Sequence, residues 1–276
     1  MAKAIRNEIY KLCRNKTLWI SAIFTFVLII GELIFSYGTL CELREIAAQY
    51  DDGEMYPYVL SRFWIGGDLA SVYNKLYYFL LPIIAVLPFA ITYYTDIRTG
   101  YMKNICTRIR KKYYILAKYL VAFVSGGLGC SVPLVFNLWL AALYTPNYPQ
   151  SVILMISPID NTSLFWDIFY SRPLVYIFIY IGMAFLYGGG FAVLSMAIVY
   201  FCRNMFVFAI FPFLINISAY YLLLNTEQRQ YVPIAFLNPL QMITGLSYSG
   251  IIITYIIMLA VSLIAVHIQI KKDVLL

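Results

Sequence analysis

Long apolar runs separated by short polar segments dominate the chain. Each of six runs provides the roughly 20 predominantly apolar residues that a helix needs to cross a bilayer: residues 18–40, 76–95, 113–144, 173–201, 204–224 and 250–270. The third and fourth runs are long, which predicts tilt or bending, and Pro82 and Pro88 predict kinks in the second. The pattern therefore predicts an all-α integral membrane protein whose six transmembrane helices form one domain over residues 1–276.

Composition supports this class and excludes several others. Of the 276 residues, 62% are hydrophobic and 12% are charged, against about 45–50% and about 25% in soluble domains. The chain contains one His and no Gly-x-x-x-x-Gly-Lys-Ser/Thr phosphate loop. We therefore expect no metal site, no catalytic residues and no ATP-binding site in this chain, and we predict that it is not itself an enzyme.

The distribution of charge predicts the orientation of the helices. Most of the 20 Lys and Arg residues fall within residues 1–17, 96–118, 202–204 and 271–276, whereas most of the acidic residues fall between these segments. Basic segments next to transmembrane helices remain on the cytoplasmic side. We therefore expect a protein of the cytoplasmic membrane with both termini in the cytosol, and the net charge of +7 then requires no nucleic-acid partner.

Residues 1–17 are expected to form a basic amphipathic helix. The residues Ala2, Ile5, Ile9, Leu12 and Cys13 fall on one face of such a helix, and basic residues fall on the other. A helix of this type lies in the membrane interface and contacts membrane lipid. As an alternative to contact with a partner subunit, its basic residues only retain the N-terminus on the cytoplasmic side and bind anionic lipid.

Residues 96–118 form the longest basic and polar run of the chain. Within it, Ile97, Tyr101 and Ile105 recur at intervals of four residues, which predicts a short helix over 97–106 with one apolar stripe. Asp96 is placed to cap the N-terminus of that helix. We expect the stripe to contact a partner, or alternatively to lie on the membrane while the basic residues determine topology.

This segment resembles the permease subunits of ABC-2 type transporters. The resemblance rests on Asp96 after the second run, on Thr99-Gly100, on Ile115-Leu-Ala-Lys118 at the start of the third run, and on Leu237-Asn238-Pro239 before the last run. Thr99-Gly100 is inverted relative to the family's usual Gly-Thr, and Ile109 stands near the place of a usual Pro.

The resemblance implies a fold with an N-terminal interfacial helix and a cytosolic coupling helix between the second and third spans. The expected partners are cytosolic ABC ATPase subunits, which would bind ATP and Mg, and a second permease copy or a homologous permease. The residues that match the coupling segment are Asp96, Ile97, Gly100, Tyr101, Ile105, Arg108 and Arg110. The expected function is export of a substrate; a membrane enzyme, a receptor or an immunity protein without an ATPase is the alternative.

Polar residues inside the apolar runs are candidates for a substrate path. Glu32, Asn137 and Asn216 fall within predicted spans, where polar groups are costly and often functional. Glu32 has alternatives, since it could reach the outer headgroups or pair with an outer Arg. Acids cluster in the outer segment 41–75, at Asp51, Asp52, Glu54 and Asp68; they favour a cationic antimicrobial peptide or drug as substrate, unless they only form a solvated face.

Small residues mark the fourth run as a packing element. Ala184, Gly188 and Ala192 are spaced four residues apart, and Gly188, Gly189 and Gly190 are consecutive. Small residues allow close approach of helices in membranes, and the triplet is also a candidate hinge. The apolar segment 226–249 is interrupted by prolines, so we expect it to re-enter the outer leaflet without crossing it.

Overall fold

The computed structural model describes residues 1–49, 59–68, 70–148, 159, 161–223, 225–241 and 245–271. Over this part of the chain the fold consists of helices, and no strand occurs in it. The outer acids Asp51, Asp52 and Glu54 lie outside the described residues.

The described helices follow one another with short connections. In chain order they are α1 (Ala2–Cys13), α2 (Lys16–Gln49), α3 (Leu60–Phe63), α4 (Val72–Val86), α5 (Ala90–Arg98), α6 (Tyr101–Cys106), α7 (Lys111–Ala141), α8 (Trp166–Ser171), α9 (Pro173–Ala197), α10 (Met205–Leu223), the 3-10 helix η2 (Glu227–Tyr231), α11 (Pro233–Phe236) and α12 (Tyr248–Lys271).

The prediction of six membrane-spanning helices is confirmed at the level of length and composition. Among the described residues, α2, α4 with α5, α7, α9, α10 and α12 are long and apolar enough to cross a bilayer. The chain therefore has the features of a multi-pass membrane protein. The helix of the first span is longer than the expected 18–40, because α2 contains 34 residues.

The second span is divided at Pro88. Helix α4 ends at Val86 and α5 begins at Ala90, because proline lacks a backbone N–H and its ring clashes with the preceding turn. Pro82 is accommodated within α4. The kink expected from Pro88 is thus a complete interruption, and it separates the apolar α4 from the more polar α5.

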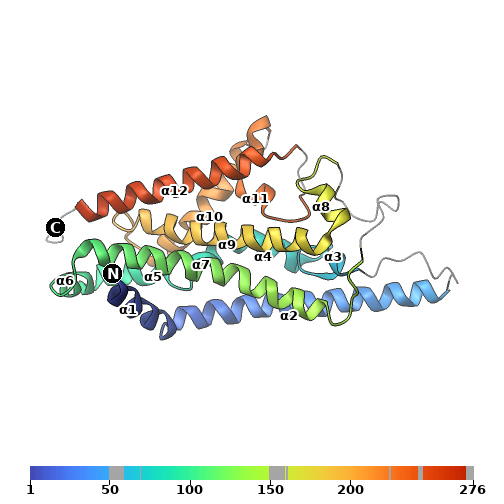
Figure 1. Cartoon of the computed structure of the whole chain (residues 1–276), viewed down its shortest axis with the longest axis horizontal. Helices are drawn as coiled ribbons and strands as arrows, with labels where there is room; N and C mark the ends of the chain where they lie inside the picture. The colour runs from blue at the N-terminus through green and yellow to red at the C-terminus, as the bar shows by residue number, and fades with distance from the viewer. Residues whose placement is uncertain are drawn as a thin grey trace.

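The long helices lie roughly along one direction, so the molecule has two distinct ends (Figure 1). One end carries the N-terminus, α1, α6 and the last turn of α12; we call it the α6 end. The opposite end carries α3 and α8, and we call it the α8 end. The connection from α5 through α6 to α7 reverses the chain direction at the α6 end.

Among the described helices, α7 and α9 make the most extensive contact with each other. A Cβ atom added to Gly126 would lie 2.6 Å from the Ala192 Cβ, and one added to Gly188 would lie 2.8 Å from the Cys130 Sγ. Ala184 and Ala192 are buried with them. This supports the packing interpretation of the small-residue stripe.

The glycine triplet does not interrupt its helix. Helix α9 runs without a break from Pro173 to Ala197. A Cβ added to Gly189 would lie 2.8 Å from the Phe123 carbonyl oxygen of α7, and one added to Gly190 would lie 2.0 Å from the Met258 Cε of α12. The triplet therefore has a packing role on two sides of α9, and its role as a hinge stays a prediction.

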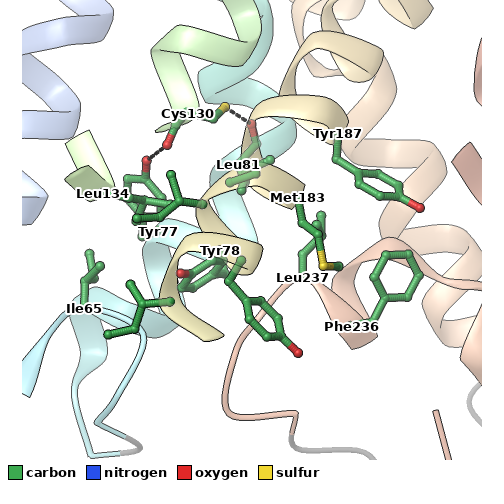
Figure 2. Close-up of a cluster of buried hydrophobic side chains, with 14 of the residues drawn as sticks. Ile65, Tyr77, Tyr78, Leu81, Cys130, Leu134, Met183, Tyr187, Phe236 and Leu237 are labelled. Atoms are coloured by element: carbon green, nitrogen blue, oxygen red, sulfur yellow. Dashed lines mark hydrogen bonds between the residues drawn. The ribbon is translucent and has the colours of Figure 1, made fainter. Parts of the chain in front are cut away.

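A buried aromatic cluster fills the half of the bundle nearer the α8 end. Figure 2 shows Tyr77, Leu81 and Cys130 within it. The Tyr77 hydroxyl donates a hydrogen bond to the Cys130 carbonyl, and the Cys130 thiol donates to the Leu81 carbonyl. These bonds satisfy polar groups that are fully shielded from water, as burial requires.

We predict that Gly188→Leu destabilises the fold, because the larger side chain forces α7 and α9 apart. Overpacking of a close contact typically costs about 1–3 kcal/mol. The measurement is thermal unfolding of the purified protein in detergent. Gly182→Leu on the same helix is the matched control, since nothing lies within 4 Å of a Cβ at Gly182. Equal unfolding temperatures for the two variants would contradict the packing role of Gly188.

Candidate functional site

A cluster of buried charges joins three helices at the α6 end. Lys118 of α7 is fully buried, and its Nζ atom lies 2.8 Å from the Glu8 Oε2 of α1 and 2.8 Å from the Asp96 Oδ2 of α5. Lys11 of α1 forms a further ion pair with the Asp96 Oδ1. We call these four residues the ion cluster. Its two positive and two negative charges balance.

Neutral groups complete the surroundings of the ion cluster. The Tyr114 hydroxyl donates a hydrogen bond of 2.7 Å to the Asp96 Oδ2, and the Lys118 ammonium donates one of 2.9 Å to the Thr92 hydroxyl. The ammonium also lies 4.5 Å from the centroid of the Phe89 ring. Transfer of an ion from water into a protein interior costs several kcal/mol, which only pairing and hydrogen bonds offset.

The inward face of α1 differs from the predicted apolar face. Ala4 and Glu8 are its buried residues. Ile5 and Leu12 are partly buried against the core of the α6 end, whereas Ile9 is 47% exposed. The predicted face is wrong in two respects: it includes the exposed Ile9, and it leaves out Glu8, which turns inward to meet Lys118.

The expected role of Asp96 as a helix cap is also wrong. Asp96 lies inside α5, which continues to Arg98, and its carboxylate faces Lys118, Lys11 and Tyr114. Helix α6 begins only at Tyr101, after Gly100 in the left-handed conformation with φ of 72°. Glycine adopts this conformation without steric cost. Gly100 thus provides the turn between α5 and α6.

The predicted apolar stripe of the 97–106 segment is mostly turned toward the chain itself. Ile97 and Ile105 pack partly buried against the core of the α6 end, and Met102, which the sequence analysis did not select, is buried at 5% exposure. Tyr101 remains 43% exposed, and the Lys11 ammonium lies 4.3 Å from its ring centroid.

The outward surface of α6 and the turn after it is polar and basic. Tyr101 shares this surface with exposed Lys103, Asn104, Thr107 and Arg108. Burial, and then the nearby Glu8 and Asp96 carboxylates, raise the pKa of the Tyr101 phenol above its ordinary value. Tyr101 therefore stays a neutral hydrogen-bond donor at physiological pH. Arg110, also exposed, precedes the first residue of α7.

A polar hollow of about 620 Å³ lies next to the ion cluster. Residues of α1, α5 and α6 line it, among them Asn7, Arg14, Thr95 and Tyr101. A second hollow of about 560 Å³ shares Asn7 and Tyr101 with the first and extends along α6 to Arg108. The α6 end is therefore a polar surface with two depressions, both of which Asn7 and Tyr101 line.

Polar side chains also tie α12 and the segment after α9 to the α6 end. The buried Gln269 of α12 accepts a hydrogen bond of 2.9 Å from the Tyr93 hydroxyl and donates one of 2.9 Å to the Met196 carbonyl. The Arg98 guanidinium donates to the Cys202 carbonyl. Gln269 was not selected from the sequence, in which it is a polar residue near the end of an apolar run.

The three candidates for a substrate path contact different parts of the chain. Glu32 is fully buried, and its carboxylate accepts hydrogen bonds from the hydroxyls of Ser36 and Ser71. The Asn137 side-chain oxygen accepts from the Ile65 amide at 2.8 Å, and the Asn216 oxygen accepts from the Ile234 amide at 3.3 Å. Within the described part of the chain no hydrogen bond joins the three, so a shared path stays a prediction.

Gln241 is one of the residues that tie the predicted outer segment 226–249 to the bundle. Gln241, with φ of 41°, accepts a hydrogen bond of 2.6 Å from the Leu164 amide and donates to the Leu164 carbonyl at 3.0 Å. Its amide also donates to the Tyr180 hydroxyl of α9. Residues 242–244 lie outside the described residues, and insertion of this segment into the membrane stays a prediction.

We predict that Lys118→Ala strongly destabilises the protein, because it leaves the Glu8 and Asp96 carboxylates buried without their shared cation. Removal of one partner from a buried ion pair typically costs about 3–5 kcal/mol. Thermal unfolding in detergent measures the loss. Lys112→Ala, at an exposed position earlier in the same helix, is the control and should unfold like the wild type. An equally stable Lys118→Ala variant would show that the ion cluster does not hold α1.

Comparisons with known proteins identify no relative of the chain: no protein-family model, no curated protein and no solved structure matches it.

Proposed function

We propose that the chain is the permease subunit of an ABC-2 type exporter. In this proposal separate cytosolic ATPase subunits bind ATP and Mg, and their movement drives a substrate out across the cytoplasmic membrane. The observation that supports it most strongly is the contact between α1 and α6 at one end of the bundle, where the ion cluster fixes α1 to α5 and α7.

The connections of α6 would convert a force on that helix into movement of the spans. The Gly100 turn joins α6 to α5, and four residues after α6 the chain enters α7. Lys118 binds acids from both α1 and α5, so α1, α5 and α7 would move together. The close α7–α9 contact at Gly126 and Gly188 would extend this movement to the centre of the bundle.

The exposed surface of α6 is the part that an ATPase subunit would contact. We infer that the docking surface is formed by Tyr101, Lys103, Asn104 and Arg108, in place of the apolar stripe. Its basic residues fit an acidic or polar groove. Arg110, at the start of α7, would lie at the anionic headgroups of the cytoplasmic leaflet.

The second permease subunit and the substrate are inferred more indirectly. Transport between two permease copies, or between this chain and a homologous permease, follows from the family resemblance. The outer acids, of which Asp68 is described, favour a cationic antimicrobial peptide or drug. The proposal places α6 and both termini in the cytosol and the α8 end outside.

We predict that single cysteines at Ser163 and Gln228 react with a membrane-impermeant thiol reagent in intact cells, in a background without native cysteines. A cysteine at Lys103 should react only after the cells are permeabilised, because α6 is placed in the cytosol. Gel-shift labelling of each variant is the measurement. Labelling of the Lys103 variant from outside would show that the orientation is the reverse of the proposed one. It would also rule out contact between α6 and an ATPase in the cytosol.

We predict that Lys103→Glu combined with Arg108→Glu abolishes co-purification of an ATP-binding subunit. The two introduced carboxylates would be repelled by the acidic groove that we propose on the ATPase. Both residues are exposed, so the variant should retain the unfolding temperature of the wild type. Arg172→Glu, an exposed charge reversal between α8 and α9, is the control. A fully retained ATPase subunit in the double variant would refute this docking surface, and absence of any ATP-binding partner from the wild type would refute the proposed function.

A further inference from the structure

A fully buried acid joins α2 to the start of α4. Glu32 of α2 has no exposed surface, and the same is true of Ser36, one turn later, and of Ser71, which precedes the first residue of α4. The Ser36 hydroxyl lies 3.0 Å from the Glu32 Oε1, and the Ser71 hydroxyl contacts the Oε2. We call these three residues the acid site. Ala70, next to Ser71 in the chain, is exposed, so the acid site lies close to the surface but is shielded from it.

No cation balances the carboxyl group of the acid site. Within the described part of the chain no Lys or Arg forms an ion pair with Glu32. The charged side chain that acts on it is Asp68, a half-buried acid of the same sign in the turn before α4. An ionised carboxyl that is buried without a cation is costly, and such a group usually binds a proton instead.

The other titratable groups around the acid site are phenols. Tyr73 of α4 packs on α2 at Gly31, where an added Cβ would lie 2.4 Å from the Tyr73 ring. Tyr78 of α4 and Tyr144, which follows α7, interact electrostatically with Glu32. The Tyr78 hydroxyl is buried, and among the described residues it makes no hydrogen bond. None of the three phenols supplies the positive charge that an ionised Glu32 would need.

The hydrogen-bond partners of Glu32 suit a neutral carboxyl as well as an ionised one. The Ser71 oxygen accepts a hydrogen bond of 3.3 Å from the Asn74 amide. A hydroxyl oxygen has two lone pairs, so it can also accept the proton of a neutral Glu32. The first amides of α4, Asn74 among them, favour a negative charge instead. This effect of a helix N-terminus is smaller than the cost of burying an unpaired ion.

We propose that Glu32 is a proton-binding site at the contact between α2 and α4. With the proton bound, a neutral carboxyl shares hydrogen bonds with Ser36 and Ser71, and α2 packs against α4. When the proton passes to water, a bare carboxylate remains beside Asp68, and the contact between the two helices weakens. The proposal holds whether or not the chain is a permease. If the α8 end faces the outside, the site responds to the external pH.

The first test compares thermal unfolding of the full-length wild type and Glu32→Gln in detergent. Glutamine keeps the size of the side chain but exchanges no proton. The folded wild type holds a proton that the unfolded chain has released at neutral pH, so its stability falls as pH rises. The unfolding temperature of the wild type minus that of Glu32→Gln should therefore decrease between about pH 5 and about pH 8. A difference that stays constant or increases over this range would show an ionised Glu32 and overturn the proposal.

Infrared spectroscopy of the folded protein detects the bound proton directly. At neutral pH the wild type should show the carbonyl stretch of a protonated carboxyl group, and Glu32→Gln should lose it. If Glu32→Gln does not fold, Ser36→Ala replaces it, because loss of the hydrogen bond to the Glu32 Oε1 should shift the same band. Absence of the band from the wild type, or a band that the folded variant leaves unchanged, would overturn the proposal.

Two controls separate the acid site from other sources of these effects. Glu42→Gln, an exposed position on the same helix, should leave the infrared band and the pH dependence of unfolding as in the wild type. Exchange of choline chloride for sodium chloride at fixed pH should stabilise the wild type and Glu32→Gln equally. A sodium effect that only the wild type shows would assign the site to a metal cation and overturn the proton site.

Discussion

The burial of the Lys118 ammonium is the constraint on which the α6 end depends. A charge at a position with no exposed surface persists only when opposite charges and hydrogen-bond acceptors surround it. The carboxylates come from two different helices, Glu8 of α1 and Asp96 of α5. If helix α1 left the bundle, the buried Lys118 ammonium would lose the Glu8 carboxylate as a partner. The N-terminal helix is therefore a structural member of the bundle, and its apolar face alone does not explain its position.

The spans could be predicted from the sequence because hydropathy and length are local properties. Each long helix coincides with an apolar run, and its end is marked by charge or by a change in composition. The interruption at Pro88 and the close packing at Gly188 could be predicted from the sequence for the same reason. Proline and glycine act on the backbone at their own positions, whatever partners the fold supplies.

The polar contacts of the candidate site could not be predicted in the same way, because they depend on partners distant in sequence. Glu8 is a charged residue within a basic segment, and such a residue is usually exposed to solvent. Its inward orientation is explained only by the ion pair with Lys118. Asp96 was assigned to a cap because the start of α6 was placed at Ile97. The left-handed Gly100 moves that start to Tyr101, and this shift also turns Met102 inward and Tyr101 outward.

The distribution of burial among the spans suggests where rearrangement is possible. The most apolar windows of α4 with α5 and of α9 are each 72% buried, whereas those of α2, α10 and α12 are 28%, 22% and 17% buried. Glycines of α7 and α9 hold these two helices in close contact, and Gly126 also approaches the Ala85 carbonyl of α4, so these three helices cannot slide past one another without clashes. Helix α2 is tied to them by the bond from Ser71 to Glu32. Helix α12 is tied by several bonds, because Gln269 bonds Tyr93, Tyr119 and the Met196 carbonyl and the Tyr187 hydroxyl donates to the Ile251 carbonyl. In the proposed exporter, a transport movement would then keep α4, α7 and α9 together and shift α2 and α10 relative to them. Because Lys118 links α1 to α5 and α7, force applied at the α6 end would act on that inner group first.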